Sequence, residues 1–145
     1  MSKIHFEKTL SSDFKLESII TKIMDFESYP EFMPSQLKQV RIVKNNENGT
    51  VTEETISFQS IIKKTFTQQT LHKKNGNSLN SKIISGPAKN TQVNVIFEEN
   101  EGKPTITVDC DIKLSLAMRI FEPLIKKYYK TYLNAFLNRL AISTT

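Results

Sequence analysis

The last thirty residues predict one long amphipathic helix, from Ser115 to Ala141. Its apolar side chains would cover an arc of roughly 200° on a helical wheel, about twice what a helix needs to sit on a core. The arc comprises Met118, Phe121, Leu124, Ile125, Tyr128, Tyr129, Tyr132, Leu133, Phe136 and Leu140. Opposite it lie Arg119, Lys126, Lys127, Lys130 and Asn134. Such a helix needs a partner that wraps around it, and a curved antiparallel sheet beneath it would leave room for an apolar ligand.

Pro123 interrupts this helix one turn after its start. Proline has no N–H to bond the carbonyl of Arg119, and its ring clashes with the preceding turn. We therefore expect a bend over residues 119–123, or a regular helix that begins at Glu122 with Pro123 in its first turn.

Length and composition favour one globular domain over residues 1–145. Charged residues make up 24% and hydrophobic ones 38%, which argues against disorder. The sequence shows no apolar run of membrane-spanning length and no apolar block typical of a signal peptide, so we expect a cytoplasmic protein. The single cysteine, Cys110, excludes an internal disulfide and a multi-cysteine zinc site. The net charge of +5 permits anionic partners without requiring one.

Turn signals divide the middle of the chain into strands. Asn48-Gly49 and Asn75-Gly76 are flanked by alternating segments, which is a strong hairpin signal, and Glu101-Gly102 marks a third hairpin. The predicted strands span 3–10, 37–47, 50–61, 64–74, 77–85, 92–99 and 103–114. Ser12 or Asp13 would cap a short helix that follows the first strand, and a second helical piece is predicted at 29–35. This order predicts an α+β fold: one strand, two short helices, six meandering strands and a long helix.

Three short motifs bring a known family into view. Tyr29-Pro30-Glu31-Phe32-Met33-Pro34 resembles the Tyr-Pro-x-Phe-x-Pro box that follows the first helix in START-like (SRPBCC) proteins of the coenzyme Q-binding and polyketide cyclase/dehydrase group. Ser85-Gly86-Pro87-Ala88-Lys89-Asn90 resembles the Gly-Pro-Phe-Lys turn of that group, and Ala135-Phe136 to Arg139 resembles the end of its last helix. The resemblance runs from about residue 4 to 141. It implies a helix-grip fold, in which a curved antiparallel sheet of about seven strands wraps the C-terminal helix around an apolar cavity.

Little in the sequence favours a catalytic site. His5 alternates with Ile4 and Phe6 and is expected to face water, and His72 is expected at a solvated hairpin end. Asp109 and Asp111 share the predicted solvent face of the last strand, so we expect no metal there and no cofactor. Cys110 is in phase with the apolar face and is expected to be a buried core thiol.

A binding cavity fits the apolar pattern better. The strands and the wide helix face would line the cavity. Tyr128 and Tyr132 would direct their hydroxyls inward or reach the helix rim. An apolar cluster of Phe26, Tyr29, Phe32 and Met33 would cover the mouth of the cavity or simply pack there. The candidate ligand-binding residues are Phe26, Tyr29, Phe32, Met33, Phe58, Val95, Phe97, Val108, Phe121, Ile125, Tyr128 and Tyr132.

The sequence thus favours a non-enzymatic carrier or chaperone of a hydrophobic small molecule, a lipid or isoprenoid quinone by resemblance. The resemblance also leaves open an aromatase/cyclase-type enzyme on a polyketide-like substrate and a ribosome-associated, toxin-like regulator. Lysines at Lys126, Lys127 and Lys130 suit a peripheral contact with an anionic membrane. Binding to RNA or the ribosome is disfavoured by the three arginines and by the lack of exposed aromatic residues among the cations.

Overall fold

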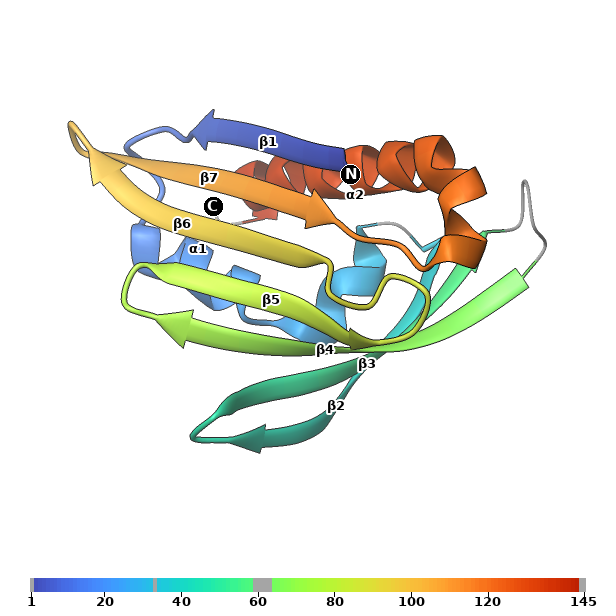
Figure 1. Cartoon of the computed structure of the whole chain (residues 1–145). Helices are drawn as coiled ribbons and strands as arrows, with labels where there is room; N and C mark the ends of the chain where they lie inside the picture. Colours follow the sequence, from blue (N-terminus) through green and yellow to red (C-terminus); the bar gives the residue numbers. More distant parts are fainter. Residues whose placement is uncertain (1, 33, 59–63, 144–145) are drawn as a thin grey trace.

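The computed structural model of the chain describes residues 2–32, 34–58 and 64–143. Within them, seven antiparallel strands form one curved sheet, and a long C-terminal helix lies across one of its faces (Figure 1). The strands are β1 (Ser2–Thr9), β2 (Leu37–Asn46), β3 (Gly49–Phe58), β4 (Lys64–Asn75), β5 (Ser78–Ser85), β6 (Gln92–Asn100) and β7 (Lys103–Ile112). The predicted α+β helix-grip architecture is confirmed.

The sheet has the order β1-β7-β6-β5-β4-β3-β2. Consecutive strands from β2 to β7 are neighbours, and β1 returns to pair with β7, with Ile4 opposite Cys110. Register shifts in β2 and between Gln69 and Thr70 of β4 bend and twist the sheet locally.

The three predicted hairpins lie where their turn residues predict. Gly49 begins β3 with φ of +126°, a conformation that L side chains rarely adopt. A Cβ atom there would lie 2.5 Å from the carbonyl oxygen of His72, because β3 and β4 approach closely at this point. Both the φ angle and the close approach therefore require glycine at this position.

Four helical segments complete the fold. They are α1 (Leu16–Ile23), the 3₁₀ helices η1 (Phe26–Glu31) and η2 (Leu116–Phe121), and α2 (Glu122–Ser143). The second expectation for Pro123 is confirmed, since the regular helix begins at Glu122 and Pro123 lies in its first turn, where its missing N–H costs little. The prediction of a single helix that begins at residue 115 is wrong for its first turns, because Leu116–Phe121 form a 3₁₀ helix.

Two further boundaries differ from the prediction. Lys15, and neither Ser12 nor Asp13, is the N-cap of α1, and it makes no side-chain capping bond. The Asp13 carboxylate instead accepts a hydrogen bond from Ser11 Oγ at 3.3 Å, in a turn before the helix. The second helical piece begins at Phe26, three residues before the predicted start.

The core lies between the concave face of the sheet and α2. Phe97, Ile106, Val108 and Ile112 are completely buried on β6 and β7. Two polar contacts of η1 hold it beside this core: Glu27 Oε2 accepts the N–H of Ile42 on β2 at 3.0 Å, and Glu31 lies 3.7 Å from Arg139 on α2. Within the described residues, no helix is long and apolar enough to cross a membrane.

Candidate ligand-binding cavity

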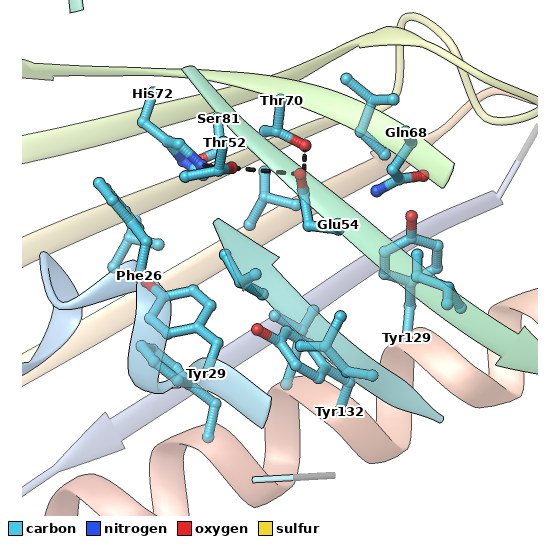
Figure 2. A pocket seen from close by; sticks show the side chains of 18 of the residues that line it. Phe26, Tyr29, Thr52, Glu54, Gln68, Thr70, His72, Ser81, Tyr129 and Tyr132 are labelled. Carbon is cyan, nitrogen blue, oxygen red and sulfur yellow. Dashed lines mark hydrogen bonds between the residues drawn. The ribbon is translucent and has the colours of Figure 1, made fainter. Parts of the chain in front are cut away.

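A cavity of about 110 Å³ lies between the sheet, η1 and α2. Figure 2 shows its wall, with strands above and the helix below. The lining residues come from β2 to β6, η1 and α2: Phe26, Tyr29, Leu37, Val40, Thr52, Glu54, Ile56, Gln68, Thr70, His72, Leu79, Ser81, Ile83, Val93, Val95, Tyr128, Tyr129, Tyr132, Leu133 and Phe136. Most of the wall is apolar, and the polar side chains gather on β3, β4 and β5.

Aromatic rings from η1 and α2 form one side of the cavity. The Tyr29 ring lies 5.2 Å from that of Phe136 and 6.4 Å from that of Tyr132, between ring centroids. Tyr132 also lies nearly parallel to Tyr128, with 6.1 Å between centroids. The Tyr29 hydroxyl donates to the backbone carbonyl of Ile23, which fixes that ring on η1. These contacts connect η1 to α2 by ring packing.

A hydrogen-bonded polar cluster forms the opposite side. Alternation places Thr52 and Glu54 of β3 on the concave face with Ile56, and it places Thr70 and His72 of β4 beside them. Thr70 donates to Glu54 Oε1, and Thr52 donates to Glu54 Oε2 at 3.2 Å. His72 Nε2 lies 2.8 Å from Thr52 Oγ1. The cluster ends at Ser81 of β5, whose Oγ lies 2.6 Å from His72 Nδ1.

The bonding pattern assigns the tautomer of His72. Because Thr52 gives its only hydroxyl proton to Glu54, its oxygen must accept the proton of His72 Nε2. The unprotonated Nδ1 then accepts from the Ser81 hydroxyl. Phe26 covers the imidazole, with the two rings stacked 3.9 Å apart.

Burial controls the ionisation of this cluster. It raises the pKa of Glu54 from 4.5 to about 7, although the hydrogen bonds from Thr70, Thr52 and Gln68 oppose the rise. Burial also lowers the pKa of His72 from 6.5 to about 4, so the imidazole is neutral at pH 7. The pKa values of Tyr29, Tyr128, Tyr129 and Tyr132 are raised, by burial first and then by neighbouring negative charge that includes Glu54. The cavity therefore holds one titratable acid and no group that carries a positive charge at neutral pH among its described lining residues.

Comparison with known proteins identifies the family. Residues 21–141 match the model of the "Polyketide cyclase / dehydrase and lipid transport" family. The chain belongs to this family. The resemblance to the polyketide cyclase/dehydrase group suggested by the three motifs is thereby confirmed. A search of curated proteins finds no match.

Solved structures agree on the fold of this polyketide cyclase/dehydrase family member. A START superfamily protein from Mycobacterium smegmatis superposes with a TM-score of 0.74 at 15% identity, covering 95% of this chain and 96% of that one. A Thermus thermophilus protein gives a TM-score of 0.76 at 10% identity, with 99% and 100% covered. The Zhui aromatase/cyclase from Streptomyces sp. R1128 gives 0.68 at 12% identity, with 96% and 94% covered. At these identities the likeness shows the fold alone.

The structure brings part of the predicted site together. Phe26, Tyr29, Val95, Tyr128 and Tyr132 line the cavity. Five other candidates lie elsewhere: Phe97, Val108 and Ile125 are buried in the packed core, while Phe32 and Phe121 are half-buried against it. Met33 lies outside the described residues, and so does the side chain of Phe58.

The expectation that His72 is solvated is wrong. It lies three residues before the end of β4, but its side chain is only 7% exposed because it points to the concave face and is covered by Phe26. Glu54, 9% exposed, was not among the predicted residues. Both could have been found from the alternation of β3, since Thr52 and Glu54 are in phase with the candidate position Phe58, and His72 pairs with this strand in register.

The remaining candidates for chemistry lie away from the cavity. His5 is exposed and lies 2.6 Å from Asp109 across β1 and β7, on the outer face. Cys110 is buried as expected, and burial, with a smaller contribution from Asp111, raises the pKa of its thiol to about 12, which keeps it unreactive.

Proposed function

We propose that this protein binds a hydrophobic small molecule in the cavity between the sheet and α2, and that it transports or chaperones that molecule, a lipid or isoprenoid quinone being the expected class. The observation that carries this proposal is an internal space lined by aromatic rings on one side and by a single polar cluster on the other. Ligand sites are typically apolar with a few placed polar groups. Membership of a family described as including lipid transport supports it.

Binding would work by sequestration. Apolar ligand surface that leaves water contributes roughly 25 cal/mol per Å², and the polar cluster fixes the orientation of the ligand's polar end. The cavity of about 110 Å³ is smaller than the roughly 150 Å³ of an engineered cavity that binds benzene. The space therefore suits about one ring, and a longer ligand would extend its tail out of the cavity or displace η1.

An exposed apolar surface at the start of the C-terminal helical region supports delivery to a membrane. Leu116 and Ile120 on η2 are 81% and 78% exposed, and Arg119 lies between them in sequence. Apolar side chains beside a cation suit shallow insertion into an anionic bilayer. We therefore include in the proposal a peripheral contact with an anionic membrane and a location in the cytoplasm. Sedimentation with vesicles containing phosphatidylserine tests the contact: wild type should bind, and a Leu116→Ser, Ile120→Ser double variant should bind much less.

Native mass spectrometry of freshly purified protein, with lipid extraction, tests the binding function directly. A bound apolar species is expected, and uptake of a fluorescent quinone analogue should be saturable. Val95→Trp should block uptake because Val95 lines the cavity. Ile96→Trp is the matched control, since Ile96 is the next residue on β6 and is 37% exposed. A protein that carries and takes up nothing, or equal uptake by both variants, would overturn the proposal.

A second candidate is an aromatase/cyclase-type activity on a polyketide-like substrate. The buried Glu54 favours it, because an acid with a pKa of about 7 inside a cavity is suited to proton transfer at neutral pH. Loss of turnover in Glu54→Gln with ligand uptake retained would support this activity. No turnover of polyketide-like substrates by the wild type would exclude it.

A further inference from the structure

The carboxyl group of Glu54 is surrounded by donors but has no opposite charge. Its two oxygens accept from Thr70 and Thr52, and Gln68 provides a further side-chain hydrogen bond. Hydroxyl and amide donors on both oxygens are the surroundings that stabilise an ionised carboxylate. A buried charge is normally also paired with an opposite charge, and this one is not.

The groups that face Glu54 from each neighbouring element are neutral. His72 on β4 is an uncharged imidazole, with its two nitrogens bonded to Thr52 and Ser81. The tyrosines of η1 and α2 stay un-ionised at neutral pH because their pKa values are raised. Glu53, the adjacent residue on β3, is an anion on the opposite face, where its Oε1 lies 2.7 Å from Arg41. Among the described lining residues there is no lysine or arginine.

Aromatic rings supply the second half of a cation site. Tyr29 and Tyr132 come from η1 and α2 and line the same cavity as Glu54 (Figure 2). The faces of such rings carry negative potential, which attracts an ammonium group within about 6 Å of a ring centroid. The cavity has room for about one ring, and it is surrounded by one carboxyl group without an opposite charge and by several aromatic ring faces. This arrangement suits a small cation that also has a hydrocarbon part.

We propose that the cavity selects an apolar amine, whose ammonium group pairs with the Glu54 carboxylate and whose hydrocarbon part lies against the tyrosine rings. This inference rests on the proposed binding of a hydrophobic small molecule and specifies its polar end, where it favours an amine over the carbonyl groups of a quinone. A ligand carbonyl is the competing possibility, since it would accept a proton held by Glu54. Burial favours the protonated form of Glu54 that a carbonyl needs, whereas the donors on both carboxyl oxygens oppose it, and an ammonium group would supply the opposite charge that the ionised form lacks.

Three compact probes with the same ring separate these possibilities: cyclohexylamine, cyclohexanol and cyclohexanone. Their dissociation constants are measured by NMR titration of the full chain at pH 6 and pH 8. Cyclohexylamine stays protonated in this range, so its affinity should follow the ionised fraction of Glu54 and rise about tenfold from pH 6 to pH 8. It should also bind more tightly than cyclohexanol at pH 8, while the affinity of cyclohexanol should not change with pH.

Two matched variants make the test specific to one carboxyl. Glu54→Gln keeps the size of the side chain and removes its negative charge, and it should remove both the preference for the amine and its pH dependence. Glu53→Gln makes the same change on the outer face and should keep both the preference for the amine and its pH dependence, although the pKa of Glu54 should fall slightly because the charge of Glu53 is the smallest cause of its rise. Circular dichroism shows whether each variant is folded, and the pH dependence of the wild type tests the proposal without any substitution.

The outcomes separate this inference from the proposed function. If cyclohexanol binds but the amine is no tighter, or if Glu54→Gln binds the amine as the wild type does, the amine proposal is overturned and the binding function stands. Tighter cyclohexanone binding at pH 6, lost in Glu54→Gln, would also overturn it in favour of a carbonyl ligand. If none of the three probes and no quinone analogue binds, both proposals fall.

Discussion

The concave face of the sheet has two differently built halves. In the packed half, formed by β1, β7 and the end of β6, most inward side chains are apolar, and Phe97, Ile106 and Val108 are completely buried. In the cavity half, formed by β3, β4 and β5, inward positions hold Glu54, His72 and other polar side chains that are also mostly buried. The difference shows that one continuous sheet can use one half for stability and the other for a polar site.

Each half satisfies its buried groups in its own way. The packed half needs only close contact between apolar side chains. The cavity half must hydrogen-bond every polar group, and it does so along the series from Ser81 through His72 and Thr52 to Glu54. Substitutions should therefore act through lost packing in one half and through lost hydrogen bonds and ionisation in the other.

The largest effect is expected from Phe97→Ala in the packed half. Phe97 is completely buried, so truncation should leave a cavity and lower the free energy of unfolding by about 3–5 kcal/mol. Urea denaturation at pH 7 measures this loss. Ile96→Ala, on the outer face of the same strand, should cost less than about 1 kcal/mol. Similar losses for both would mean that this half is not tightly packed.

The next largest effect is expected in the pH dependence of stability, which tests the ionisation of Glu54 in the cavity half. The pKa of Glu54 is about 7 when folded, against an ordinary 4.5, so the folded state holds one more proton than the unfolded state between these values. This contribution to stability is fully present below pH 4.5 and is lost as the pH rises through 7. The free energy of unfolding of the wild type, relative to Glu54→Gln, should therefore fall by about 3 kcal/mol over that range.

His72 changes the pH dependence of stability in the opposite direction, so the effect of Glu54 is seen only by comparison with Glu54→Gln. Its pKa is lowered to about 4, so the unfolded state binds more protons between pH 4 and 6.5 and stability rises with pH there. The two effects nearly cancel in the wild type from pH 4.5 to 6.5. In Glu54→Gln the rise due to His72 should become visible. A wild-type-to-variant difference that does not change with pH would show that Glu54 is not buried as described.

The same division explains what could be predicted from the sequence. The strands, hairpins and long helix followed from Asn-Gly turns and apolar alternation, and the alternation of β7 located Cys110 and its neighbours in the core. The burial of the polar cluster did not follow, because alternation places Glu54 and His72 on the inward face of the sheet but does not show that their side chains are covered. Its burial depends on Phe26, which covers His72 from a helix 46 residues earlier in the chain, and no local pattern records that contact.

A smaller effect is expected from His72→Ala, which the sequence alone would predict to be neutral. The substitution removes the stacked partner of Phe26 and leaves the buried hydroxyl of Thr52 and the half-buried hydroxyl of Ser81 without their imidazole. We expect a loss of about 2 kcal/mol in the free energy of unfolding at pH 7. His5→Ala is the control, because His5 is exposed and its contact with Asp109 should contribute less than about 1 kcal/mol. Equal losses in the two variants would contradict the assignment of His72 to a buried cluster.

The smallest effect is expected as a difference in stability between two Val→Ala variants at the boundary of the two halves, where Val95 of β6 pairs directly with Val108 of β7. Both side chains lie on the concave face, but Val95 lines the cavity and Val108 is completely buried in the packed core. Val→Ala removes the same two methyl groups at either position. At Val108 every lost contact is with protein, so we expect the free energy of unfolding to fall by about 2 kcal/mol. At Val95 part of the side-chain surface already faces empty space, so fewer contacts are lost.

The loss at Val95 should therefore be about 1 kcal/mol smaller, measured by urea denaturation of both variants under identical conditions. Val95→Ala should also enlarge the space available to a ligand, so uptake of the quinone analogue should be retained or increased, while Val108→Ala should leave uptake unchanged. A loss at Val95 as large as that at Val108, with uptake unaffected in both, would mean that the cavity does not extend to β6. The boundary between the two halves would then lie at β5.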